Sequence, residues 1–157
     1  MAKTDPEDWR TAWWTALAAV IPYTVINQLA AAAERSLNKN AHARMTGYFA
    51  YSQSDYFPLL FLAVLFFVIF AIVFVYSMII TRMPSNWAYR GILLGTFLFL
   101  VGVLPFTVQA GFTTNMPSSV AWGTLFFGLI SNIVNGGLIA YIHMRITNPE
   151  TKKKKDK

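Results

Sequence analysis

Five uncharged amide side chains are the residues of this sequence best placed to do chemistry away from water. They lie inside long apolar stretches, at Asn27, Gln28, Gln109, Asn132 and Asn135. An amide both donates and accepts hydrogen bonds, and its burial in hydrocarbon is costly unless it is bonded. Two interpretations stay open: hydrogen bonds between helices, at about 0.6–2 kcal/mol per contact, or a polar lining for a solute or cofactor.

Histidine and cysteine limit the cofactor chemistry. The sequence has two histidines and no cysteine, which excludes thiolate catalysis, iron–sulfur clusters and cysteine zinc sites. His42 and His143 fall at opposite ends of the predicted spans, so they cannot ligate one haem together. His143 is a candidate ligand for a pigment, against the plainer interpretation of a polar cap at the membrane surface. We predict no metal site, and no cofactor beyond a bound lipid, quinone or pigment.

Catalytic patterns are missing from the sequence. No predicted span carries Asp, Glu, Lys or Arg in its middle, where proton relays and ion-coupled transporters place them. There is no nucleophile elbow, phosphate loop or HExxH motif. We therefore expect neither an enzyme nor an autonomous pump, and we assign no catalytic residue.

The amides lie within long stretches without charged residues, and the structure of these stretches determines where the amides lie. Only 13% of the residues are charged, against about 25% in soluble domains. Apolar runs of about 20 residues are long enough to cross a bilayer as helices. We predict an all-α integral membrane protein with four transmembrane helices in an antiparallel up-down bundle. The predicted spans are residues 11–33, 57–80, 89–112 and 119–143.

The segments outside the spans set the predicted orientation. Residues 1–10, the turn 81–88 and the tail 144–157 share one side, and together with Arg90 at the start of the third span they hold ten of the 13 basic residues. The 23-residue loop 34–56 and the turn 113–118 hold the other three. Positive charge accumulates on the cytoplasmic side, so we expect both termini in the cytoplasm, with a bacterial cytoplasmic membrane as the location. Acidic residues near the N-terminus disfavour a cleaved signal peptide.

Glycines mark the expected packing faces. Gly91, Gly95 and Gly102 recur at helical spacing in the third span, and Gly128 and Gly136 do so in the fourth. Small residues let membrane helices approach closely, so we expect these two faces to meet. The second span has no such face: it is apolar all round and should contact lipid, a partner or a pigment. Two interior prolines, Pro22 and Pro105, should kink their helices.

The basic tail and the long loop are the expected contact surfaces. Lys152, Lys153, Lys154, Lys155 and Lys157 should reach anionic lipid headgroups or act only as topology signals. The loop mixes charges with aromatic residues, and it is either an interaction surface or a plain linker. The expected partners are the lipid bilayer and other integral membrane subunits, and no nucleic acid.

Three functions follow as hypotheses. The first is a non-catalytic subunit or assembly component of a larger membrane complex, because the spans have packing surfaces and no ionisable chemistry. The second is a small channel or carrier for a neutral solute through the amide-lined interior. The third is a protein that binds a pigment, quinone or lipid.

Overall fold

Four long helices dominate the structure, as the sequence predicts. The computed structural model describes residues 6–43, 57–113 and 116–147. Within them, Trp9–Leu37, Leu62–Ile79, Trp87–Phe112 and Ser118–Thr147 are long and apolar enough to cross a membrane. The prediction of an all-helical fold with four such helices is therefore confirmed, and it indicates a membrane protein.

The elements follow the chain in a simple order. Helix α1 covers Pro6–Leu37, and the short α2 covers Lys39–Ala43. Helix α3 covers Phe57–Ile79 and continues into the 3₁₀ turn η1, Ile80–Arg82. The third span consists of α4 (Trp87–Leu98), the π-helical segment η2 (Phe99–Val103) and α5 (Leu104–Thr113). Helix α6 covers Ser118–Thr147.

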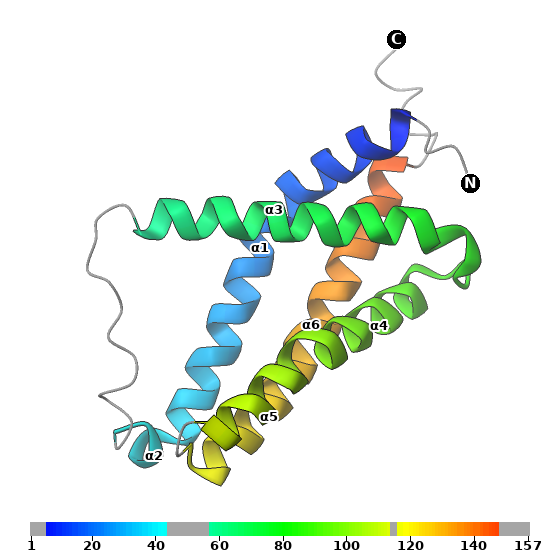
Figure 1. Ribbon diagram of the computed structural model, residues 1–157. Coiled ribbons are helices and arrows are strands. Elements are labelled where there is room, and N and C mark those ends of the chain that lie inside the picture. The colour runs from blue at the N-terminus through cyan, green and yellow to red at the C-terminus, as the bar shows by residue number, and fades with distance from the viewer. Residues whose placement is uncertain (1–5, 44–56, 114–115, 148–157) are drawn as a thin grey trace.

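Helix α6 is the centre of the packing. It contacts α4 along one side and α1 along another, whereas α3 makes its main contacts with α1. In Figure 1, α3 crosses α1 at a steep angle and diverges from α4 and α5. This differs from the expected up-down bundle, in which α3 would lie alongside its neighbours. The start of α1 and the end of α6 lie at the same end of the molecule (Figure 1).

One face of α3 is buried, although the sequence shows no such face. Ile69 and Val73 are 0% exposed and Tyr76 is 1% exposed, and their spacing of four and three places them on one side of the helix. They pack with small residues of α1 (Ala12, Ala16 and Ala19) in the main core cluster. Aromatic contacts extend the crossing, because the Trp13 ring lies edge-on to Phe66, 4.9 Å between centroids.

The interior proline of the third span produces a π-helical segment. Pro105 has no N–H to donate to the carbonyl four residues earlier, which weakens the α-helical pattern before it. The N–H of Leu104 instead donates to the Phe99 carbonyl, five residues earlier. The expected irregularity at Pro105 is thus a widened turn. Pro22 lies within α1, which runs unbroken from Pro6 to Leu37.

The turn before α4 ends in a helix cap. Asn86 lies in extended conformation before Trp87, and its side-chain oxygen accepts a 2.9 Å hydrogen bond from the Ala88 N–H. The cap satisfies a backbone donor that the helix itself leaves unbonded. It fixes where the third span begins.

Candidate functional site

Glycines bring α4 and α6 into backbone contact. A Cβ atom added to Gly136 would lie 2.5 Å from the Gly95 nitrogen and 2.8 Å from the Gly95 Cα. A Cβ added to Gly91 would collide with the backbone of Gly137, and one added to Gly95 would collide with that of Asn132. Because real Cβ atoms do not approach other atoms so closely, these positions require glycine. The close approach fixes the position of α6 relative to the third span.

Gly102 and Gly128 differ from these three. An added Cβ on Gly128 would lie 2.6 Å from Cγ1 of Val103, so this glycine makes room for a side chain from η2. An added Cβ on Gly102 would meet no atom within 4 Å, and Gly102 is exposed. Gly102 therefore does not belong to the packing face on which we expected it. The widened turn of η2 places it beside a cleft instead.

Two of the amides join α1 to α6. The Asn135 side chain, 0% exposed, donates from Nδ2 to Oδ1 of Asn27 over 3.0 Å. Asn132 uses its own Nδ2 to bond the Gly128 carbonyl at 2.7 Å, within α6. These geometries match the interhelical and local hydrogen bonding that buried amides require.

Gln28 and Gln109 lie in different environments from Asn27, Asn132 and Asn135. Both side chains are exposed on the outside of their helices. Gln28 follows Asn27 directly, and a step of one residue turns the side chain by about 100° around a helix. The expectation that it shares the interior with Asn27 is therefore wrong. Gln109 lies in the last part of the third span, away from the bonded asparagines.

His143 is a buried side chain and not a surface cap. It is 4% exposed, and its ring lies edge-on to the Tyr76 ring, 5.3 Å between centroids. The contact joins the ends of α3 and α6. In the described parts of the chain, no group of three or more His, Asp or Glu side chains could hold a metal ion.

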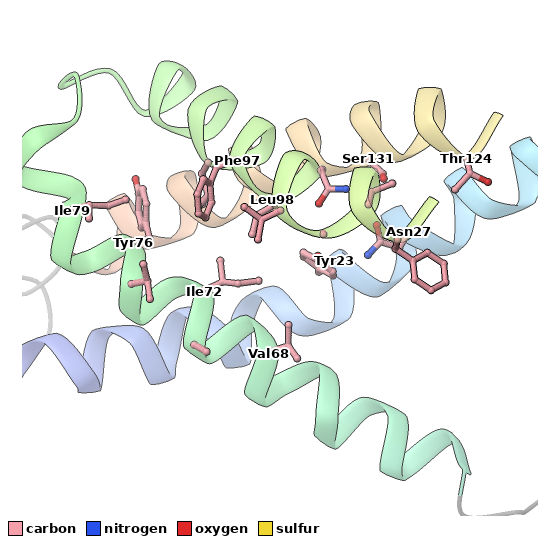
Figure 2. A pocket seen from close by; sticks show the side chains of 18 residues that line it. Tyr23, Asn27, Val68, Ile72, Tyr76, Ile79, Phe97, Leu98, Thr124 and Ser131 are labelled. Carbon is pink, nitrogen blue, oxygen red and sulfur yellow. The ribbon is translucent and has the colours of Figure 1, made fainter. Parts of the chain in front are cut away.

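A cleft of about 750 Å³ lies between α3 and the third span. Helices α1 and α6 contribute further lining residues (Figure 2), and α3 diverges from the third span (Figure 1). The walls are apolar, contributed by Val68, Ala71, Ile72, Val75, Ile79, Phe97, Val101, Val103 and Phe106. Pockets of about 300–1,000 Å³ with apolar walls and a few polar groups are typical ligand sites.

Most polar side chains of the cleft gather toward one end. Asn27, Ser131 and Thr124 lie together in Figure 2, whereas Tyr76 and Ile79 lie at the opposite end. Asn132 also lines the cleft. An elongated molecule in this cleft would thus meet hydrocarbon along most of its length, several hydrogen-bonding groups at one end and the Tyr76 phenol at the other.

A smaller cavity of about 200 Å³ adjoins the end with Asn27, Ser131 and Thr124. The two spaces share four lining residues, Asn27, Val103, Thr124 and Ser131. Glu34 lines the smaller cavity, and its side chain is only 6% exposed. Asn38 donates from Nδ2 to Oε1 of Glu34 at 3.1 Å, and the missing side chain of Gly123 leaves room for both.

The sequence-based boundaries missed Glu34. We expected the first span to end at residue 33, because the first charge after it normally marks the membrane surface. Helix α1 instead continues to Leu37. A signal was present: Tyr23, Asn27 and Glu34 recur at helical spacing and therefore share one face of α1.

Some predicted contact residues lie outside the described residues. These are the tail lysines Lys152, Lys153, Lys154, Lys155 and Lys157, and residues 44–56 of the loop. Comparison with protein-family models, curated proteins and solved structures gives no match. The function is therefore argued from the cleft and its residues.

Proposed function

We propose that this protein is a non-catalytic membrane protein that binds an elongated amphiphile in the cleft between α3 and the third span. The observation that carries the proposal is the cleft itself, with apolar walls and a polar end formed by Asn27, Thr124 and Ser131. A lipid tail of the bulk bilayer could fill the apolar part alone. The polar end distinguishes a specific ligand from bulk lipid, because buried polar groups favour a molecule that hydrogen-bonds to them.

Gly102 offers a direct test of this proposal. It lines the cleft, and a side chain there would begin without a clash. Gly102→Phe should therefore fill the cleft while the helix packing stays intact. Gly111→Phe is the matched control, since Gly111 also has open space around an added Cβ and does not line the cleft.

The measurement is lipid extraction and mass spectrometry of protein purified in mild detergent. We expect the wild type and Gly111→Phe to retain an amphiphile enriched over the bulk membrane lipids. Gly102→Phe should retain about tenfold less, which corresponds to a loss of about 1.4 kcal/mol of binding free energy. An unenriched lipid profile in the wild type, or equal retention by both variants, would contradict the proposal.

A second candidate is the non-catalytic subunit of a larger membrane complex. The arm of α3 before its crossing with α1 supports it: Leu62, Val64 and Phe67 are exposed, and α3 diverges from the third span (Figure 1). A partner helix could pack against this arm. Native gel electrophoresis after mild solubilisation should then show a particle larger than the protein in its micelle, and a homogeneous small particle would rule the candidate out.

The orientation belongs to the same proposal. We infer an antiparallel path with both termini in the cytoplasm, because ten basic residues fall on that side of the predicted topology and three on the other. The chain has no cysteine, so single cysteines can be introduced at Ser85 and Asn40. Ser85→Cys should be labelled by an impermeant thiol reagent only after the membrane is opened, and Asn40→Cys in intact cells. The opposite pattern would reverse the topology.

A further inference from the structure

The two cavities adjoin each other along α1. Their four shared residues, Asn27, Val103, Thr124 and Ser131, lie where the large cleft meets the small cavity. Hydrogen-bonding side chains follow this path from Tyr23 through Asn27 to Glu34. The end of the cleft with Asn27, Thr124 and Ser131 therefore lies next to a carboxylate, and the end with Tyr76 and Ile79 lies away from it.

The residues that line the two cavities favour a positively charged ligand over a negatively charged one. Among the described residues 6–43, 57–113 and 116–147, Glu34 is the one carboxylate that lines either cavity, and no lysine or arginine of these residues lines them. The neighbouring cations Arg35 and Lys39 are exposed outside this space. A carboxylate accepts hydrogen bonds and stabilises a nearby positive charge, and a charge-assisted hydrogen bond is stronger than a neutral one.

The two cavities differ in volume, and the difference indicates which part of a ligand each cavity can hold. The small cavity, about 200 Å³, has the volume of about six or seven water molecules at about 30 Å³ each. It can hold a small polar head group and no long chain. The cleft of about 750 Å³ is within the range of sites that hold whole ligands, about 300–1,000 Å³, and its apolar walls suit a hydrocarbon chain.

We propose that the two cavities bind a single-chain amphiphile with a protonated amine head group, its ammonium against Glu34 and its chain in the cleft. This inference rests on the proposed function and names the chemical class of its ligand. The ammonium donates hydrogen bonds to the Glu34 carboxylate, and the Thr124 and Ser131 hydroxyls lie along the entrance to the small cavity.

Three probes with one hydrocarbon chain and different head groups test the proposal. Oleylamine, oleyl alcohol and oleic acid are titrated against the whole chain in detergent, and binding is measured by native mass spectrometry. We expect the amine to bind tightest and the acid weakest. The amine should bind about tenfold or more tightly than the alcohol, because a hydrogen bond to a charged group contributes more than a neutral one.

Two variants separate the role of Glu34 from that of net charge. Glu34→Gln keeps the shape and removes the charge, and it should reduce the preference for the amine over the alcohol to about twofold or less, well below the tenfold scale of a charge-assisted bond. Glu7→Gln removes the same charge at the other end of α1 and should leave the preference unchanged.

The outcomes distinguish the two proposals. Equal binding of all three probes by the wild type overturns the amine assignment and leaves amphiphile binding intact, even if Glu34→Gln does not accumulate. A preference for the amine that persists in Glu34→Gln overturns the assignment too. Binding of none of the probes overturns both the amine assignment and the proposed function.

Discussion

Gly136 and Gly137 are neighbours in α6, but a side chain would meet very different surroundings at the two positions. An added Cβ on Gly136 would lie 2.5 Å from the Gly95 nitrogen and collide with the Gly91 carbonyl oxygen. An added Cβ on Gly137 would meet nothing within 4 Å. The pair Gly136→Ala and Gly137→Ala therefore compares the same chemical change inside and outside one helix interface.

The expected magnitude follows from these distances. Non-bonded carbon contacts are most favourable at about 3.5–4.0 Å, so Gly136→Ala must move α4 and α6 apart by about 1 Å. A gap of about 0.5–1 Å forfeits a quarter to a half of each dispersion contact. Overpacked sites lose about 1–3 kcal/mol of stability, and we expect this range for Gly136→Ala.

Gly137→Ala should be neutral or stabilising. The new methyl group meets open space, and alanine favours a helix over glycine by about 0.5–1 kcal/mol. Unfolding of the whole protein by SDS in mixed micelles, followed by circular dichroism, gives both free energies. Equal midpoints for the two variants, or a less stable Gly137→Ala, would refute the claim that the glycine contact holds the third span to α6.

Three further predictions use the same unfolding measurement or hydrogen exchange. In a double-mutant cycle of Asn27→Leu and Asn135→Leu, the coupling should be about 0.6–2 kcal/mol for their hydrogen bond, and a value near zero would contradict the bond. Val73→Ala removes two buried carbon groups and should cost about 2 kcal/mol, at about 1 kcal/mol for each methyl-sized part of the cavity, whereas Val64→Ala, at a side chain 54% exposed, should cost far less; equal costs would contradict the buried face of α3. Pro105→Ala restores a backbone donor, so the amides of η2 should exchange more slowly with deuterium by mass spectrometry; unchanged exchange would contradict the proline origin of the widened turn.

The number of long helices was predictable from the sequence, since it depends on local composition. Hydrocarbon excludes unbonded backbone groups, and each charge-free run therefore predicts one helix. The ends of the helices were less predictable. The Glu34 side chain bonds Asn38, four residues further along the chain, and fits beside Gly123. The contact with Gly123 depends on the packing of α6, which composition does not reveal.

The packing partners of α3 could not be predicted for a related reason. Its residues are apolar on every side, so no hydrophobic pattern distinguishes the buried face from the exposed one. The small residues that receive it, Ala12, Ala16 and Ala19, lie on α1 and are all 0% exposed. The complementary pattern was thus in another helix. For Asn135 the type of interaction was predictable, but its partner Asn27 became evident only from the structure.

Two local features together produce the cleft, and neither of them alone would predict a cleft from the sequence. Pro105 removes a backbone donor and widens the turn at η2, which exposes Gly102 and directs Val103 toward Gly128. Helix α3 packs on α1 and diverges from the third span (Figure 1). A packing defect between apolar helices would be expected to have apolar walls throughout, since lipid and side chains are equally apolar. The polar groups from α1 and α6 at one end, and the carboxylate beyond them, therefore argue for a site that selects its ligand by the head group.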